Sequence, residues 1–409
     1  MHIARTTSKL VLGFGLAVTL AAAPPAGAVQ GAAFGQCVAG LRSLAAEQGY
    51  PPETLDAAFA DIRQSQRVLR LDRQQPEFFF TFWDYIERTV TNHRVERGRR
   101  LLERHHDILQ NVYRDFGVRP EYLLAFWGLE TNYGNVLGGF SVLNALATLA
   151  CDERRGEFFT KEFFSALKIV EAENIPVKKL RGSWAGAMGH TQFLPSVFLE
   201  HALDFDADGR RDIYGSLPDV FASSANYLRA IGWQPGERWG REVIAPKNFD
   251  WSLANPQIKK PISEWNTLGI KTAFGDALPA VDIEGSVIAP AGFRGPAFLV
   301  YGNFDVAMRW NKSTSYALAV GILADRITGS AGLVTKKPRG FRPLTRDDVV
   351  EIQTTLNDLG YDSGEPDGVV GRQTRSAARE FQLQAGLVAD GFPDKNLLYY
   401  LRKSRKSAQ

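Results

Sequence analysis

Apolar residues recur three and four positions apart along most of the chain, the spacing that places them on one face of an α-helix. The pattern is continuous over 37–116 and returns in three later segments, which predicts helices over 161–174, 218–231 and 315–327. Over 233–302 the character changes to short apolar runs broken by proline and glycine, which predicts a small β-rich lobe. We therefore expect a mainly α-helical protein with one β-rich lobe.

The last part of the chain has a hydrophobic pattern of its own. Apolar residues at helical spacing predict one helix near 349–359 and another over 374–384. The basic segment 335–342, which contains proline and glycine, is the best candidate for a linker. We therefore expect a large domain over 29–334 and a separate small domain over 343–409.

One of the predicted helices carries an acid on its apolar stripe. The segment 120–134 begins with proline, which suits a first helical position, and Leu123, Trp127 and Glu130 follow on one face. Gly134 helps to end the helix soon after Glu130, where the helix dipole and poor solvation favour a protonated acid. Such a carboxyl can act as a general acid. A solvent-facing glutamate at a helix end is the alternative that the segment alone leaves open.

The segment 181–196 is rich in glycine and alanine around Trp184 and Gln192. Small residues let a bulky ligand approach the backbone, while tryptophan offers a stacking face and glutamine offers hydrogen bonds. A tightly packed helix junction has the same composition. The segment alone therefore leaves both interpretations open.

An acidic segment matches the opening of an EF-hand loop, with carboxylates at positions 1, 3 and 5, glycine at 6, a backbone carbonyl at 7 and a carboxylate at 9. These positions are Asp204, Asp206, Asp208, Gly209, Arg210 and Asp212. Position 12 departs from the pattern because it is Gly215, and Asp219 is the nearest later acid. The segment predicts a Ca²⁺ site, with an acidic turn that holds no ion as the alternative.

The first 28 residues resemble a secretory signal peptide. Two basic residues precede an apolar run over 10–23, and Ala26-Gly27-Ala28 offers a small-residue cleavage site. The run is too short to span a bilayer. We therefore expect a periplasmic protein that is exported through a cleaved signal, with no transmembrane segment in the mature chain.

The two cysteines, Cys37 and Cys151, both lie in the expected mature chain. An oxidising compartment permits a disulfide, so we expect the two to be paired. Two separately buried thiols are the alternative.

Composition narrows the possible chemistry. The mature chain has 46 basic residues, once Arg5 and Lys9 are removed, against 45 acidic residues, which gives no reason to expect nucleic acid as a partner. The six histidines form no H-E-x-x-H pair, and the chain has no nucleophile elbow, phosphate-binding loop or dinucleotide fingerprint. Acid–base chemistry without an organic cofactor remains, and aromatic and amide side chains suit a saccharide substrate.

Several separated motifs resemble those of the membrane-bound lytic murein transglycosylase B family, glycoside hydrolase family 103. They are FWGLETNYG (126–134), GSWAGAMGHTQFLPS (182–196), DFDADG (204–209), SANYL (224–228) and NF…WNKS (303–313). The resemblance runs from about residue 35 to residue 330 and implies a lysozyme-like α+β catalytic domain. Residues 345–402 similarly resemble a type 1 peptidoglycan-binding domain, a small three-helix module.

The resemblance also implies roles for individual residues. The acid of the E-[ST]-x-x-G motif, which is the catalytic acid and base of the family, is Glu130 here. Substrate contacts are implied at Ser183, Gln192, Arg154, Arg155, Tyr133 and Asn303. The calcium ligands implied are Asp204, Asp206, Asp208, the carbonyl of Arg210, and Asp219 as the distal acid, with a structural role for the ion. Trp310 departs from the family, which commonly has a tyrosine near that position.

The reaction implied is cleavage of the β-1,4 bond between N-acetylmuramic acid and N-acetylglucosamine without water. Glu130 protonates the leaving oxygen and then accepts the proton of the muramic C6 hydroxyl, which leaves a 1,6-anhydro end. The partners implied are peptidoglycan glycan strands, bound by a monomer. A hydrolytic muramidase with a second carboxylate, or a wall-binding scaffold without activity, are the alternatives.

Overall fold

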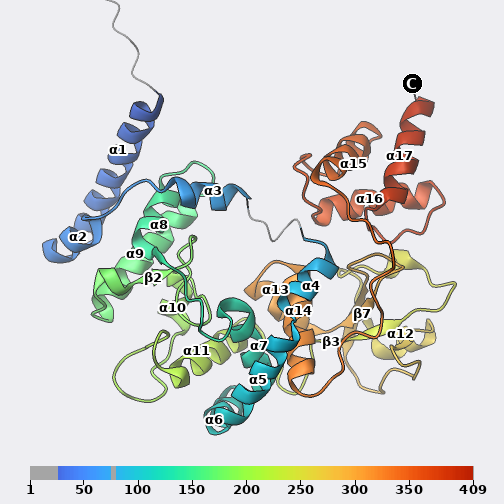
Figure 1. Cartoon of the computed structure of the whole chain (residues 1–409), viewed down its shortest axis with the longest axis horizontal. Coiled ribbons are helices and arrows are strands. Elements are labelled where there is room, and N and C mark those ends of the chain that lie inside the picture. The colour runs from blue at the N-terminus through green and yellow to red at the C-terminus, as the bar shows by residue number, and fades with distance from the viewer. Residues whose placement is uncertain (1–25, 75–79, 409) are drawn as a thin grey trace, which may run out of the picture.

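The computed structural model describes residues 26–74 and 80–408 of the chain (Figure 1). The expected signal peptide lies outside these residues except for its last three, which begin helix α1. The described residues contain 17 α-helices and two small antiparallel sheets. The mainly helical fold expected from the hydrophobic pattern is confirmed.

The helices of the large domain form most of its core, and they cover each segment where the pattern predicted a helix. In chain order they are α1 (Ala26–Glu47), α2 (Pro52–Phe59), α3 (Gln66–Gln74), α4 (Phe82–Thr89), α5 (Asn92–Arg104), α6 (His106–Phe116), α7 (Pro120–Thr131), α8 (Val142–Ala150), α9 (Gly156–Ala172), the 3₁₀ helix η2 (Val177–Lys179), α10 (Pro195–His201), α11 (Leu217–Ala230), α12 (Ile262–Thr267), α13 (Gly302–Trp310) and α14 (Thr314–Ile327). A two-stranded sheet, β1 (Phe140–Ser141) with β2 (Arg181–Gly182), joins the loops around α8 and α9.

Helix α7, which carries Glu130, is deeply buried. It packs against α5, α6, α11 and α14, and its residues from Tyr122 to Gly128 are all buried. Pro120 occupies the first turn, where its missing N–H costs no hydrogen bond. The helix ends at Asn132 and Tyr133, both of which have positive φ angles, followed by Gly134 at φ +79°. This left-handed turn places Glu130 in the last turn of a rigid element.

The β-rich lobe predicted over 233–302 is confirmed as a five-stranded antiparallel sheet with the strand order β4-β6-β7-β3-β5. The strands are β3 (Gly240–Ile244), β4 (Lys260–Pro261), β5 (Lys271–Thr272), β6 (Glu284–Ile288) and β7 (Ala297–Val300). The lobe has its own small hydrophobic core around the fully buried Trp265, with α12 and the 3₁₀ helix η3 (Trp251–Leu253) beside it.

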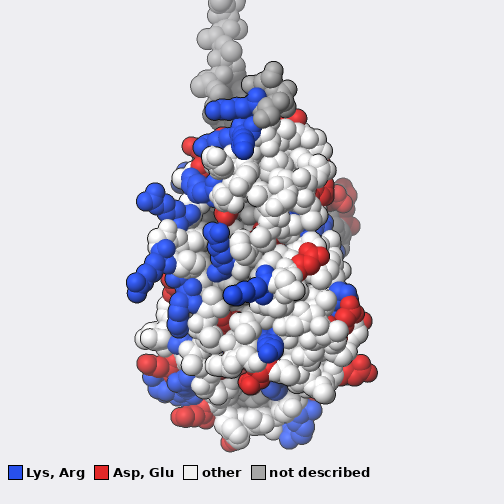
Figure 2. Space-filling model, turned by 90° about the vertical axis from the view of Figure 1, so that its right-hand side faces the viewer, with Lys and Arg blue, Asp and Glu red and all other residues white. Residues whose placement is uncertain are grey.

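The C-terminal unit is a three-helix domain with a separate core, as the resemblance implied. Its helices, α15 (Arg346–Asp358), α16 (Arg372–Gln384) and α17 (Lys395–Ala408), lie above the β-rich lobe in Figure 1. Basic and acidic side chains are both present on this side of the molecule, and the basic ones are more numerous along one edge (Figure 2).

Polar contacts dock the C-terminal domain on the lobe. The Phe293 N–H donates to the Asp390 carboxylate at 2.9 Å, and Arg379 donates to the Ala254 carbonyl at 3.2 Å. Arg375 donates to the Pro290 carbonyl, and burial lowers the pKa of this guanidinium to about 10, so it stays charged at neutral pH. The small domain is therefore held at a defined place on the lobe.

The linker predicted over 335–342 is also fixed at its beginning. The Glu242 carboxylate accepts the backbone N–H groups of Val334 and Thr335, each at 2.7 Å. Lys337 forms ion pairs with Asp84 and Glu87 of α4, each at 3.2 Å. The segment thus joins the lobe and α4 before it enters the small domain.

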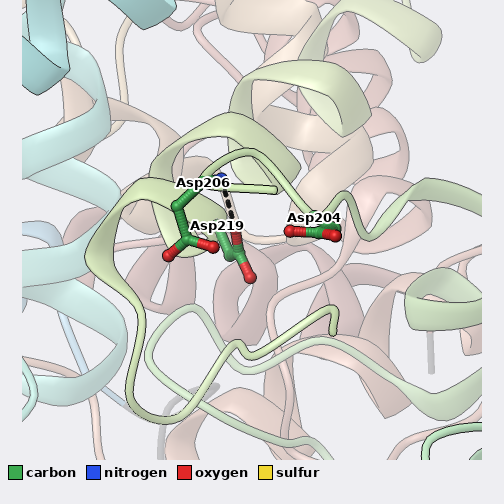
Figure 3. A group of neighbouring side chains, drawn as sticks. All are labelled: Asp204, Asp206 and Asp219. Atoms are coloured by element: carbon green, nitrogen blue, oxygen red, sulfur yellow. Dashed lines mark hydrogen bonds between the residues drawn. The ribbon is translucent and has the colours of Figure 1, made fainter. Parts of the chain in front are cut away.

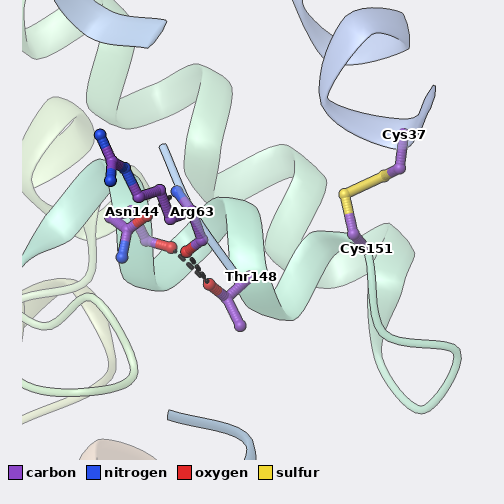
Figure 4. Close-up of a disulfide and its surroundings, with 5 residues drawn as sticks. All are labelled: Cys37, Arg63, Asn144, Thr148 and Cys151. Carbon is purple, nitrogen blue, oxygen red and sulfur yellow. Dashed lines mark hydrogen bonds between the residues drawn. A yellow bond between two sulfur atoms is a disulfide. The ribbon is translucent and has the colours of Figure 1, made fainter. Parts of the chain in front are cut away.

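The disulfide expected between Cys37 and Cys151 is confirmed, and it attaches α1 to the end of α8 (Figure 4). Near it, the Arg63 N–H donates to the Asn144 side chain, and the Thr148 hydroxyl donates to the Arg63 carbonyl. These two bonds attach the segment after α2 to α8. The bridge closes a loop with a sequence separation of 114 residues. In the chain-entropy model, a loop of that size destabilises the unfolded state by about 4–5 kcal/mol.

None of the helices that the structure describes is long and apolar enough to cross a membrane.

Candidate active site

Glu130 is partly buried, and two side chains from distant helices donate hydrogen bonds to one of its carboxyl oxygens. Trp310 Nε1, at the end of α13, lies 2.9 Å from Glu130 Oε1. Tyr316 Oη, in the first turn of α14, lies 2.5 Å from the same oxygen. Two bonds to one oxygen fix the rotation of the carboxyl group, which proton transfer in a defined direction requires.

Both donors keep their protons over the working pH range. The indole N–H of Trp310 can only donate. Tyr316 is buried, and this burial, followed by the charge of Glu130, raises the pKa of Tyr316 well above its usual value. Tyr316 was missed at the sequence level because a hydroxyl near the start of an apolar helix gives no signal of what it faces. Trp310 was noted only as a departure from the family.

The Trp310 ring belongs to an aromatic cluster beside Glu130. The Trp310 ring packs against Phe126 of α7 at a centroid distance of 4.6 Å, against Tyr227 of α11 at 5.2 Å and against Phe193 at 5.6 Å. Aromatic faces stack on sugar rings and exclude water from charged groups. Trp310 and Tyr227 are the partly exposed rings of this cluster, so they can offer a saccharide an apolar face beside the oriented acid.

The glycine-rich segment forms a compact loop stabilised by Ser183 and Gln192. Ser183 Oγ accepts the N–H groups of Ala185 and Ala187, at 3.3 and 3.0 Å. Gln192 adopts φ +53°, and its amide donates to the carbonyls of Gly189 and Leu137, at 2.9 and 3.2 Å. Both side chains are partly buried, and Gln192 connects this loop with the segment that follows α7.

The arginine pair is engaged with an acid of α3. Arg154 and Arg155 both form ion pairs with the buried Asp72, and Arg155 also lies over the Phe159 ring. These contacts hold the turn between α8 and α9 against α3.

The structure does not place Tyr133 and Asn303 as the resemblance implied. Tyr133 is 3% exposed, and its hydroxyl donates to the Arg94 carbonyl at 2.9 Å. Asn303 is fully buried, where its side chain bonds with the backbone of Gln234 and Glu237. Because their polar atoms are used inside the core, neither side chain is positioned to contact a substrate.

Three of the predicted metal ligands lie together (Figure 3). One carboxylate oxygen from each of Asp204, Asp206 and Asp219 lies within 4.8 Å of the others. Asp219 is fully buried and accepts N–H groups from Phe205 and Asp212, at 2.7 and 2.8 Å. Burial, followed by the charge of Asp206 among the groups that raise it, raises the pKa of Asp219. The carboxylates are pre-arranged, and a bound cation would offset their mutual repulsion.

The other two predicted ligands lie at the exposed tip of the same loop. The Asp208 carboxylate accepts the Arg210 N–H at 2.9 Å, so it is turned toward its own backbone. Asp208 does not belong to the three-acid group. Oxygen donors of this kind match the preference of Ca²⁺ for hard ligands.

Comparisons with known proteins find relatives of both parts of the chain. The family model described as transglycosylase SLT domain matches residues 33–325, and the model described as putative peptidoglycan binding domain matches residues 345–401. The membrane-bound lytic murein transglycosylase B of Escherichia coli is 29% identical over 300 residues, which cover 69% of this chain and 79% of that protein.

Solved structures are similar over much of the chain. SltB3 from Pseudomonas aeruginosa, in complex with NAG-anhNAM-pentapeptide, is 42% identical with a TM-score of 0.86, covering 90% of this chain and 99% of that one. The Escherichia coli lytic transglycosylase Slt35, in complex with calcium, is 27% identical with a TM-score of 0.62, covering 72% and 92%. Since the family model spans most of the chain, the protein belongs to the transglycosylase SLT domain family, with a peptidoglycan-binding domain at its C-terminal end.

Proposed function

We propose that the protein is a peptidoglycan lytic transglycosylase in which Glu130 is the only acid and base. The observation that supports this role most directly is the carboxyl group itself, which Trp310 and Tyr316 orient beside an aromatic wall. In the family to which the chain belongs, the relative SltB3 has been solved with a NAG-anhNAM-pentapeptide. That ligand contains an anhydro sugar, which favours the transglycosylase over a hydrolytic muramidase.

The mechanism uses Glu130 twice. As an acid it protonates the oxygen between N-acetylmuramic acid and N-acetylglucosamine, and the bond from that oxygen to muramic C1 breaks. The C6 hydroxyl of the same muramic residue then bonds to C1, and the carboxylate accepts the hydroxyl proton. The nucleophile is intramolecular, so no second carboxylate is needed to activate water, unlike in the two-carboxylate glycosidases.

Neighbouring side chains position the substrate in this proposal. The Trp310 and Tyr227 rings offer a stacking surface next to Glu130. Ser183 and Gln192 remain the proposed polar contacts, because both are partly exposed on the loop that faces the segment after α7. Arg154 and Arg155 are the proposed contacts for the part of a glycan strand that extends to the turn between α8 and α9.

We further propose that Asp204, Asp206 and Asp219 hold a structural Ca²⁺, assisted by Asp208 and the Arg210 carbonyl. A divalent cation would supply charge that neutralises three converging carboxylates. The calcium complex of Slt35 supports the choice of ion. The cation would be structural and would not touch the reacting atoms at Glu130.

The C-terminal domain is proposed to bind the cell wall, as its family description indicates, and to keep the catalytic domain at its substrate. A murein substrate places the protein outside the cytoplasmic membrane, and the expected signal peptide would deliver it to the periplasm as a monomer.

One experiment tests the main proposal. Purified peptidoglycan is digested with the wild-type protein and with Glu130→Gln, and the released sugar ends are identified by mass spectrometry. We expect 1,6-anhydro ends from the wild type and no release from the variant. Reducing ends would instead indicate a muramidase, and no release by the wild type would indicate a wall-binding scaffold.

A further inference from the structure

His190 lies between the catalytic helix and the acidic loop, and two of its hydrogen bonds reach α7. Trp127 Nε1 donates to His190 Nδ1 at 2.8 Å. Thr131 Oγ1 donates to the His190 carbonyl at 2.7 Å. Trp127 and Thr131 are on either side of Glu130 in the last turn of the helix, so His190 holds the turn that carries the acid.

Two other hydrogen bonds of His190 reach the end of the acidic loop. Its Nε2 lies 3.1 Å from the Tyr214 carbonyl, and its backbone N–H donates to the Ile213 carbonyl at 3.0 Å. These residues directly follow Asp212, whose N–H donates to the buried Asp219 carboxylate. The position of 212–214 is thus set by the same carboxylate that belongs to the proposed cation site.

The bonding pattern fixes the tautomer of the ring. An indole N–H can only donate, so Nδ1 must accept and the ring proton is on Nε2, where it donates to Tyr214. Burial lowers the pKa of His190, which keeps the ring neutral near pH 7. One neutral imidazole therefore accepts a hydrogen bond from Trp127 and donates one to the Tyr214 carbonyl at the same time.

The ring has little freedom to move independently of α7. Gly134, in the turn after Glu130, packs directly against it: a Cβ at this position would lie 2.7 Å from His190 Nδ1. Gly134 also has φ +79°, which strains any other residue. Movement of the imidazole is therefore transmitted to the turn that follows the acid.

We infer that His190 is a positioning residue that couples the acidic loop to Glu130. When the cluster of Asp204, Asp206 and Asp219 binds a divalent cation, residues 212–214 become fixed, and the His190 ring transfers this constraint from Tyr214 to Trp127. The inference rests on the proposed function, since it assumes that Glu130 is the acid and that the loop binds a cation.

Substitutions at position 190 test the two side-chain hydrogen bonds of His190 separately. In His190→Asn the amide oxygen can take the place of Nδ1 and accept from Trp127, but the shorter side chain does not reach Tyr214. His190→Phe keeps a ring and removes both bonds. His106→Asn, which changes an exposed histidine, is the control.

Activity is measured with calcium and with a chelator, well below the unfolding temperature. In the wild type and in His106→Asn, chelation is expected to lower kcat about tenfold with KM unchanged, which is a typical size for coupling between two sites. His190→Asn should keep kcat with calcium within about threefold of wild type, and chelation should change it less than twofold. His190→Phe should have low kcat in both conditions.

A spectroscopic measurement tests the coupling without activity. The Trp127 indole N–H resonance, identified by its absence in Trp127→Phe, should shift when calcium is added to the wild type and should not shift in His190→Asn. The calcium-dependent rise in Tm should persist in both proteins. A resonance that stays fixed in the wild type, or a chelator effect on kcat that survives in His190→Asn, would overturn the inference.

The failures of the two ideas are distinguishable. If calcium changes neither Tm nor the Trp127 resonance, the coupling fails while the anhydro product and the effect of Glu130→Gln are unaffected. If Glu130→Gln remains active, the proposed function fails, whatever the resonance does.

Discussion

Two carboxyl groups in this protein are held by several hydrogen bonds, but the donors come from very different distances along the chain. Glu130 accepts from Trp310 and Tyr316, which lie 180 and 186 residues further on. Asp219 accepts from the backbone of Phe205 and Asp212, only 14 and 7 residues away. The proposed catalytic acid is held by groups that only the tertiary structure brings near, whereas the acid of the loop is held by neighbours in the sequence.

The kind of donor also differs. Backbone N–H groups point at Asp219 because the loop is folded, and no substitution of a donor residue other than one to proline removes them. Side-chain donors point at Glu130 only while α13 and α14 stay packed on α7, and a single substitution removes either donor. The comparison predicts that changes at distant side chains alter kcat, while changes in the loop alter stability and cation dependence.

The largest effect is expected from Glu130→Gln. The amide is nearly the same size as the acid, but it cannot donate and recover a proton, so kcat should fall by about 10²–10⁴-fold or more. The melting temperature and binding to intact sacculi should stay close to wild type. Activity is measured by release of anhydro ends from purified peptidoglycan. Retention of more than about one per cent of activity would contradict the role of Glu130.

Tyr316→Phe should have the next largest effect. Loss of one hydrogen bond to a charged group costs about 1.5–3 kcal/mol, which corresponds to a fall in kcat of about 10- to 100-fold. KM should change little, because the hydroxyl contacts the acid rather than the sugar. Trp310→Phe should lower kcat and also raise KM, since it removes a donor and reduces the stacking surface.

Tyr301→Phe is the matched control for Tyr316→Phe. Tyr301 is also buried and its hydroxyl is also bonded, but to Arg241 in the β-rich lobe. Its loss should reduce stability and leave kcat unchanged. Equal losses of kcat in both variants would mean that the hydroxyl of Tyr316 acts only through packing.

The contrast between near and distant donors explains what could be predicted from the sequence. The position of Glu130 on an apolar stripe, the three acids of the loop and the helical segments are local patterns, and each is present in the structure. Tyr316 could not be predicted, because its role arises only when α14 packs on α7. His190 carried no signal for the same reason.

Distant contacts also changed the roles of residues that a motif had suggested. Tyr133 and Asn303 lie in segments that resemble family motifs, yet both side chains are buried and hydrogen-bonded to the backbone in the core. The basic segment near Lys337 had the composition of a free linker, but acids of α4 bind it. The local sequence shows which chemical groups a segment carries. The groups that bind them come from distant parts of the chain, so the local sequence does not show them.

Asp219→Asn should abolish the cation dependence of stability. A ligand present at 100 times its Kd and bound only by the folded state raises the free energy of unfolding by about 2.7 kcal/mol. We expect calcium to raise the Tm of the wild type by several degrees and the Tm of the variant not at all. Differential scanning calorimetry with calcium and with a chelator measures both.

Asp250→Asn is the control for this change, because the Asp250 carboxylate also accepts a backbone N–H, from Ser252 in the β-rich lobe. It should lower Tm equally with calcium and with chelator. If calcium still stabilises Asp219→Asn as much as wild type, the three-acid group is not the cation site.

The smallest effects are expected from replacing two serines, and these replacements compare the two carboxyl groups directly. Ser216 and Ser313 are the N-cap residues of α11 and α14, and each accepts the backbone N–H of the residue three positions on, at 3.3 Å. Those residues are Asp219 and Tyr316. Replacing either serine with alanine should lower the free energy of unfolding by about 1 kcal/mol, the usual cost of a lost cap.

The two variants should differ in activity, although they share the same loss of stability. Ser313→Ala loosens the first turn of α14, which carries the donor to Glu130, so kcat should fall about two- to fivefold in proportion to the weakened bond. Ser216→Ala loosens the loop and also removes the bond from Ser216 Oγ to Asp206, so at saturating calcium kcat should stay at the wild-type level while more calcium is needed to reach it. Denaturant unfolding and calcium titrations of kcat measure both quantities. Equal kcat losses at saturating calcium would show that the two carboxyl groups do not differ in the way that their donors suggest.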